Sequence, residues 1–195
     1  MKVIIGTDEA GRGPLAGPVY AAAVALPDDF PFEILNDSKK MTEKARERAE
    51  IIIKEKALAW AVASIGPEEI DQINILNAAL KAMKISCEEV AKTLVENNII
   101  DEIDIKVLAD GNRMPSVNLE CETVVKGDSK IHQIMAASIL AKTGRDRYML
   151  EAAQKWPQYG FENHKGYPTA SHYRAIEEYG PCPIHRLSFK GVCQR

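Results

Sequence analysis

Runs of apolar residues, each ended by turn-forming residues, predict five β-strands in this chain. Val, Ile and small apolar residues dominate these runs, a composition that favours extended structure. The strands are expected at residues 2–7, 19–26, 57–65, 103–109 and 121–126. The second and third runs are rich in alanine, and we expect each of them to be buried on both faces of a sheet.

Helices are expected between and after these strands. Thr42 opens a run of strong helix formers at 43–56, whose charges alternate in sign and suit an exposed face. Residues 73–98 carry apolar side chains at helical spacing and predict one long amphipathic helix. Two further helices are expected at 129–156 and 169–179.

The order of these elements predicts an α/β fold with a mixed sheet. Three consecutive strands favour antiparallel pairing, whereas the later strand–helix–strand units require parallel crossovers. Helices are then expected on the faces of the sheet. No repeat or linker divides residues 1–195, so a single domain is the simplest organisation. The pattern leaves the order of the strands in the sheet open.

Composition and charge narrow the class of protein. Apolar residues make up 46% and charged residues 27%, as in soluble globular proteins. No stretch reaches the roughly 18–20 apolar residues of a membrane helix, and the first residues lack a secretory signal, so we expect a cytoplasmic protein. Residues 1–110 hold 13 Lys and Arg against 20 Asp and Glu, a balance of −7, whereas residues 111–195 hold 12 against 8, a balance of +4. A modest positive face is compatible with duplex binding, although such asymmetry is also common on solvated surfaces.

Four cysteines lie far apart and without a CxxC pair, so we expect reduced and mostly structural thiols. They are Cys87, Cys121, Cys182 and Cys193. Cys182 and Cys193 with His185 have the residue types of a zinc site, but their spacing does not fit the common finger patterns.

Four carboxylates follow or end predicted strands. Asp8 and Glu9 follow the first, Asp110 the fourth and Asp128 the fifth, each near a glycine. Open α/β sheets place their sites at the carboxyl ends of strands, so these side chains are expected to converge. Because neighbours on a strand point to opposite faces, Asp8 and Glu9 can share one site only if the strand frays or bulges.

Clustered carboxylates repel one another unless hard divalent cations neutralise them. Ligands that are all oxygen suit Mg²⁺ or Mn²⁺, and two such ions roughly 3.5–4 Å apart can drive phosphoryl displacement. The alternative is that these residues are turn and cap residues, since Asp beside Gly is common in turns.

A glycine-rich segment at 11–19 follows the first carboxylates directly. Its glycines allow the backbone to approach a ligand closely, and Arg12 can reach a phosphate or sugar. No GK[ST] or GxGxxG pattern is present, so it is not a common nucleotide-binding loop. A tight turn between two strands explains the glycines but not Arg12.

Together, seven motifs in family order closely resemble the type 2 ribonuclease H family, ribonuclease HII. They are TDEAGRGPLAGPV at 7–19, NDSKK at 36–40, ADGN at 109–112, KGDSK at 126–130, AASILAK at 136–142, HKGYPT at 164–169 and GPCPIHRLSF at 180–189. The chain is shorter than a ribonuclease HIII with its extra N-terminal domain.

The resemblance implies an RNase H-like fold with a C-terminal helical part. It also implies hydrolysis of RNA–DNA hybrids and nicking on the 5′ side of single ribonucleotides in duplex DNA, with 5′-phosphate and 3′-hydroxyl ends. By family match the catalytic and metal-binding residues are Asp8, Glu9, Asp110 and Asp128, with Mg²⁺ or Mn²⁺ as the metal.

Further residues match substrate-binding positions of the family. The segment Gly11-Arg12-Gly13 resembles the motif that contacts the ribose 2′-hydroxyl, and Tyr167 resembles a tyrosine that stacks at the RNA–DNA junction. Without the match, Tyr167 would be an ordinary loop aromatic. Lys39 and Ser129 are expected at phosphates, with a helix-cap neighbourhood as the alternative.

The histidines are not expected to be catalytic. Residues 131–135 depart from the family pattern, and His132 is expected to face the sheet end or solvent. His164 and His185 are expected to make structural hydrogen bonds, and His172 gives no signal.

Two other classes of protein compete with the nuclease: a silent nucleic-acid-binding module and a metal-dependent phosphatase or nucleotidyl-transferring enzyme. Four intact carboxylates argue against the binding module, because they repel phosphates. We expect a monomer that binds a hybrid or ribonucleotide-containing duplex and no membrane.

Overall fold

A five-stranded mixed sheet forms the centre of the molecule. The computed structural model describes residues 2–193. The strand order is β3-β2-β1-β4-β5, in which β1 pairs antiparallel with β2 and parallel with β4. The strands are β1 (Val3–Ala10), β2 (Val19–Ala25), β3 (Ala59–Ile65), β4 (Ile105–Asp110) and β5 (Glu120–Val124). The expected mixed sheet is therefore confirmed, and β1 is its central strand.

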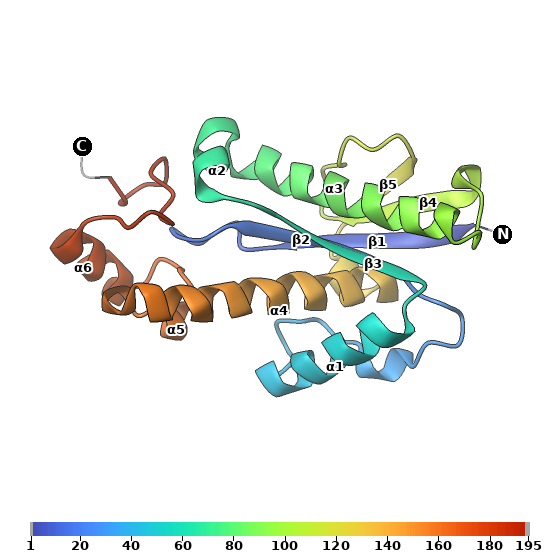
Figure 1. Cartoon of the computed structure of the whole chain (residues 1–195), viewed down its shortest axis with the longest axis horizontal. Helices are drawn as coiled ribbons and strands as arrows, with labels where there is room; N and C mark the ends of the chain where they lie inside the picture. Colours follow the sequence, from blue (N-terminus) through green and yellow to red (C-terminus); the bar gives the residue numbers. More distant parts are fainter. Residues whose placement is uncertain (1, 194–195) are drawn as a thin grey trace.

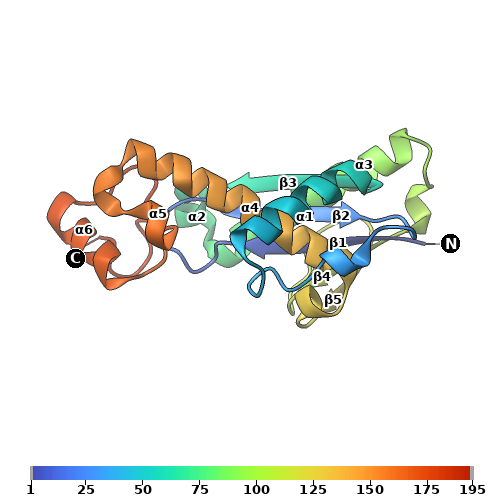
Figure 2. The same ribbon diagram turned by 90° about the horizontal axis from the view of Figure 1, so that it is seen from below.

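Helices cover both faces of this sheet (Figure 1). One face carries α2 (Pro67–Ile73) and α3 (Ile75–Glu96), and the other carries α1 (Glu43–Lys56) and α4 (His132–Lys155). Two short helices, α5 (Phe161–His164) and α6 (Ala170–Tyr179), lie beyond the end of the sheet, near the end of α4 (Figure 2). Single 3₁₀ turns occur at Phe32–Ile34, Glu102–Asp104, Gly127–Ser129 and Pro157–Tyr159.

Small side chains bring α4 close to the sheet. Ala136, Ala137 and Ala141 are completely buried against it. At Gly6 of β1 an added Cβ would lie 2.3 Å from the backbone carbon of Gln133, a distance that real structures do not allow. This glycine therefore lets the start of α4 approach the strand that carries Asp8.

The opposite face is packed by the apolar stripe of α3. Met83, Cys87, Val90 and Leu94 are all buried, at the spacing expected for one face of a helix. A fully buried side chain of this size contributes about 1.5–3 kcal/mol relative to its exposed state. The stripe thus fixes the sheet against its second layer.

The C-terminal helices have an apolar cluster of their own. Phe161, Tyr159 and Ile184 pack there with Met149 from α4 and with Leu15 from the loop after β1. The loop that follows the first strand is therefore packed into the C-terminal part of the chain.

Several predicted boundaries were wrong. The long helix expected at 73–98 is α3, which begins two residues later because Asn74 has a φ of 66° and caps α3 by accepting from the N–H of Asn77. The short helix α2 before it was not predicted. The helix expected from residue 129 begins at His132. The third strand was expected to be buried on both faces, but β3 is an edge strand whose residues alternate between exposed and buried or half-buried positions.

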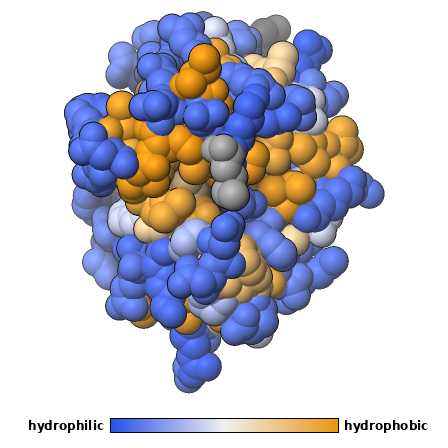
Figure 3. All heavy atoms as spheres, turned by 90° about the vertical axis from the view of Figure 1, so that its right-hand side faces the viewer, coloured by the Kyte–Doolittle hydropathy of each residue, from blue (hydrophilic) through white to orange (hydrophobic). Residues whose placement is uncertain are grey.

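Apolar side chains are also exposed at the end of the molecule where α3 ends (Figure 3). Ile103 is 85% exposed there, and Ile99 and Val95 are each 39% exposed. This end holds the amino ends of β1 and β4, whereas the predicted site residues lie toward their carboxyl ends. Within residues 2–193 no helix is long and apolar enough to cross a membrane.

Candidate active site

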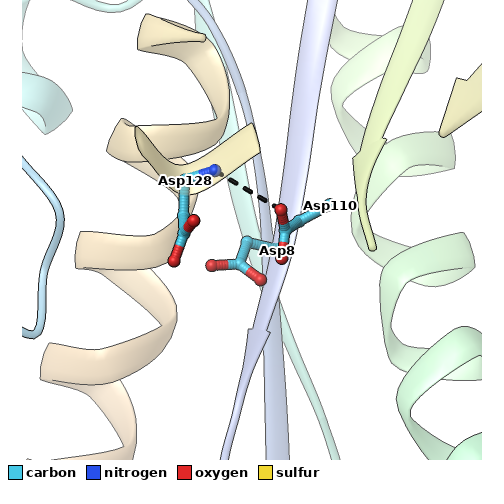
Figure 4. A group of neighbouring side chains, drawn as sticks. All are labelled: Asp8, Asp110 and Asp128. Atoms are coloured by element: carbon cyan, nitrogen blue, oxygen red, sulfur yellow. Dashed lines mark hydrogen bonds between the residues drawn. The ribbon is translucent and has the colours of Figure 1, made fainter. Parts of the chain in front are cut away.

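Three carboxylates from separate parts of the chain meet beside the central strand (Figure 4). Asp8 lies near the carboxyl end of β1, and Asp110 is the last residue of β4. The parallel register pairs Thr7 with Ala109, which places Asp8 and Asp110 at the same level of the sheet. Asp128 comes from the 3₁₀ turn after β5. Each of the three side chains offers an oxygen within 4.8 Å of the others, as the strand-end argument predicts.

Backbone hydrogen bonds hold the cluster in place. The Oδ1 atom of Asp110 accepts from the N–H of Gly127 at 2.6 Å and from the N–H of Asp128 at 3.4 Å. Asp8 accepts from the N–H of Glu9 at 2.7 Å. The turn after β5 is thereby tied to the end of β4, which orients Asp128 toward the other two carboxylates.

The cluster is electrostatically strained. Asp8 is only 5% exposed, and burial, followed by the charges of Glu9 and Asp110, raises its pKa well above the ordinary value, although a hydrogen bond with Ser138 opposes this. A buried carboxylate beside like charges favours its neutral form unless a cation compensates it. The site is therefore suited to binding positive charge.

Glu9 does not join this group. The strand neither frays nor bulges at this point: β1 pairs regularly with β2 as far as Ala10, so Asp8 and Glu9 point to opposite faces. Glu9 lies in a groove with Asp110 and residues of α3, and it accepts from Arg12 at 3.3 Å. Burial raises its pKa, Arg12 lowers it, and Asp110 raises it further. The expectation that a distorted strand brings all four carboxylates together is thus not met in this conformation.

Lys39 reaches the cluster from the segment before α1. Its Nζ donates to Asp128 Oδ2 at 2.9 Å, and this bond raises the pKa of Lys39. Ser38 anchors the segment through a 2.9 Å hydrogen bond with Ser138 of α4. Lys39 is therefore beside the carboxylates and is no helix cap.

The glycine-rich loop lies next to the cluster, where β1 ends. Gly11 has a φ of 97°, and an added Cβ would lie 2.1 Å from Arg145 Nε, so only glycine fits. Arg12 and Gly13 are exposed. The ring of Tyr167, 42% exposed, is close to Gly13 and 5.8 Å from the guanidinium carbon of Arg145. The structure thus brings the loop and Tyr167 together.

Ser129 is exposed and lies in the 3₁₀ turn before α4, where its hydroxyl donates to the carbonyl of Lys126. It does not cap α4, because the N-cap position is Ile131. The structure therefore gives no support to the cap alternative for this residue.

Two buried arginines that the sequence reasoning did not single out hold the loop from inside. Arg145 and Arg186 are 1% and 0% exposed, and they donate to carbonyls of residues 11–18. Arg186 lies inside the GPCPIHRLSF motif, but its burial and its bonds to carbonyl groups leave no trace in the sequence.

The histidine side chains stack on other rings or form hydrogen bonds within the fold. His132 is exposed and stacks on Phe32, with ring centroids 4.5 Å apart. The imidazole of His164 lies 2.9 Å from the carbonyl of Tyr159, and His185 accepts from the N–H of Cys182. His172 gave no signal in the sequence, yet its Nε2 is 3.0 Å from that of His185 in a buried pair.

A divalent cation fits the carboxylate cluster. Asp8, Asp110 and Asp128 are the only group of metal-ligand side chains found together in residues 2–193. Oxygen ligands suit Mg²⁺ or Mn²⁺. Within the described residues Cys182 and His185 belong to no such group, and Cys193 is exposed.

Comparison with known proteins shows the family to which the chain belongs. The family model for ribonuclease HII matches residues 5–192. The chain belongs to the ribonuclease HII family. A ribonuclease HII of Dechloromonas aromatica (strain RCB) is 51% identical over 193 residues, which cover 99% of this chain and 93% of that protein.

Solved structures share the fold of this ribonuclease HII family member. The ribonuclease H2 of Pyrococcus horikoshii OT3 superimposes with a TM-score of 0.70 at 25% identity, over 97% of this chain and 94% of that one. Bst-RNase HIII, solved in complex with Mn²⁺, gives a TM-score of 0.74 at 17% identity, over 98% of this chain and 68% of that one. Family membership and fold together identify the chain as an endoribonuclease, a hydrolase of phosphodiester bonds.

Proposed function

We propose that this endonuclease cuts the RNA strand of RNA–DNA hybrids and nicks duplex DNA on the 5′ side of a single embedded ribonucleotide. The products carry 5′-phosphate and 3′-hydroxyl ends. The observation that carries the proposal is the cluster of Asp8, Asp110 and Asp128 directly beside an exposed glycine loop. The carboxylate cluster can hold cations at a phosphodiester, and the backbone of the glycine loop can approach a ribose.

The cofactor in this proposal is a pair of divalent ions, Mg²⁺ or Mn²⁺. Asp8, Asp110 and Asp128 would hold them, since their oxygens already converge. Two bound cations would activate the attacking water and stabilise the leaving oxygen of the cleaved strand. Glu9 is the fourth proposed ligand, and its side chain must first leave Arg12.

Each remaining residue has a role set by its position. Lys39, whose Nζ lies at the edge of the cluster where it donates to Asp128, would contact a substrate phosphate. Ser129 is exposed at the same turn and would contact a neighbouring phosphate. Gly11, Arg12 and Gly13 would meet the ribose 2′-hydroxyl, the group that distinguishes RNA from DNA.

The test is a labelled duplex that contains one ribonucleotide, compared with the same duplex in all-deoxy form. We expect one nick, 5′ to the ribonucleotide, that depends on Mg²⁺ or Mn²⁺, and no cleavage of the all-deoxy control. Asp128→Asn should lower turnover by at least about 100-fold, because the residue is assigned to metals. Binding without a nick would indicate a binding module, and phosphate release from small esters would indicate a phosphatase.

Tyr167 provides a second arm of this test. Its ring is exposed beside the loop, and stacking of a base on an aromatic ring is worth about 1–3 kcal/mol. Tyr167→Ala should therefore reduce cleavage at a single ribonucleotide about tenfold or more and affect long hybrids less. Equal losses on both substrates would remove the stacking role.

A further inference from the structure

The loop after β1 is held by its carbonyl groups. Arg186 donates from Nη2 to Gly11, from Nη1 to Arg12 and Pro14, and from Nε to Gly17, at 2.6–3.0 Å. Six of the eight carbonyl groups of residues 11–18 accept from the guanidinium groups of Arg186 and Arg145, and that of Leu15 accepts from the backbone N–H of Arg186.

The backbone N–H groups of the loop fall into two kinds, those with an acceptor and those without. Leu15 and Gly17 donate to the carbonyls of Gly166 and Ile184. Over the described residues 2–193, the N–H groups of Arg12 and Gly13 have no acceptor, and both residues are exposed. Because the carbonyls on both sides are turned to the buried arginines, these two donors remain available at the surface beside the carboxylate cluster.

The two arginines hold this loop at an electrostatic cost. Neither forms an ion pair within the described residues, and burial followed by the charge of Arg145 lowers the pKa of Arg186 to about 9. Arg145 Nη1 is buried without a partner. Burying a charge without a carboxylate partner costs free energy, and apolar side chains would fill the same space at lower cost. We therefore expect the two arginines to have a role other than stabilising the fold.

We propose that Arg186, supported by Arg145, is a positioning residue for ribose recognition. The guanidinium holds the carbonyls of the loop inward, and the N–H groups of Arg12 and Gly13 are thereby presented to the 2′-hydroxyl. This inference rests on the proposed function. A planar guanidinium can serve four carbonyls at once, whereas an ammonium has three donors and no fixed plane.

The experiment measures binding of two duplexes that differ by one 2′-hydroxyl, with Mg²⁺ present and in an Asp128→Asn background that prevents turnover. Arg186→Lys keeps the charge and should lower the preference for the ribonucleotide duplex about tenfold, with all-deoxy affinity changed by less than about twofold. Arg147→Lys is the matched control: Arg147 lies on α4 two residues from Arg145 and pairs with Glu50, so the same substitution there should leave both affinities unchanged.

Two further readouts separate positioning from general destabilisation. Exchange of the hydrogen-bonded amides of Leu15 and Gly17 should become at least about tenfold faster in Arg186→Lys, whereas exchange in α3 should not change. Mn²⁺ affinity in an otherwise unchanged chain should stay within about twofold, since Arg186 does not contact the carboxylates. If Arg186→Lys does not fold, Arg145→Lys, which alters two of the loop bonds, should lower the preference about threefold.

Retention of the full preference by a folded Arg186→Lys protein would overturn the inference, as would an equal loss of affinity for both duplexes. A chain that shows no preference and no nick before Arg186 is altered would instead refute the proposed function. The two failures are therefore distinguishable.

Discussion

At the residue scale, the carboxylate cluster opposes stability. Burial, followed by the charges of Glu9 and Asp110, raises the pKa of Asp8. Its contribution to stability is present below the ordinary pKa of an unfolded Asp and is lost as pH rises through the raised folded value. At neutral pH without metal, the ionised carboxylate therefore weakens the fold.

Asp8→Asn should stabilise the metal-free protein at pH 7 while abolishing activity. The expected gain is on the order of 1 kcal/mol, or about 2–4 °C in melting temperature for a chain of this size. Thermal unfolding in EDTA measures it, and the gain should disappear toward pH 4, where Asp8 is protonated. A lower melting temperature for the variant at pH 7 would contradict the assignment of strain to Asp8.

The sequence could predict part of this site. Asp8, Asp110 and Asp128 were predictable because strand ends in open sheets share one edge. The separation of Glu9 depends on whether one strand distorts locally, which no residue pattern decides. The roles of Arg145 and Arg186 lie in bonds to distant carbonyl groups, and these become visible only in the folded chain.

At the scale of elements, the periodicity of apolar residues located nearly every strand and helix but missed the short helix α2. The pattern at 73–98 corresponds to α3, and Asn74, with a φ of 66°, separates this helix from α2. Hydrophobic periodicity reports which face is buried and does not report a single left-handed residue. The side-chain cap from Asn74 to Asn77 supplies the local reason for the break.

Asn74→Ala should destabilise the protein by about 1–2 kcal/mol, because alanine loses the cap and resists a positive φ. Asn74→Gly is the matched control: it loses the cap but accepts the φ, and should cost only a few tenths of a kcal/mol. Urea unfolding measures both. Equal effects of the two substitutions would show that the left-handed backbone is not what Asn74 provides.

At the scale of the whole molecule, the mixed sheet and its flanking helices followed from element order, whereas the joining of the C-terminal part to the loop after β1 did not. That junction includes a buried group of histidines, with His172 against His185 and His164 stacked on His172. Tyr159 and Cys182 also face His185. These contacts connect residues far apart in the chain, so spacing alone gives no signal.

The contribution of His185 to stability should fall as pH drops from about 6.5 to about 4. Burial, followed by the charge of His172, lowers the pKa of His185 to about 4, so the unfolded state binds the proton first. The contribution of His185 is complete above the unfolded pKa and is lost through this window, on the order of 2–3 kcal/mol.

Chemical unfolding at several pH values tests this expectation on His185→Gln. The difference in unfolding free energy between the unaltered chain and the variant should shrink as pH falls from 7 to 4. A difference that stays constant would show that His185 is not buried in its neutral form.

We propose above that Asp8, Asp110 and Asp128 hold divalent cations at one site. A crystal grown with Mn²⁺ and measured for anomalous scattering tests it most directly. Anomalous peaks are expected among these three carboxylates, with Lys39 displaced from Asp128. Manganese bound only elsewhere, with the three carboxylates left as they are, would contradict it.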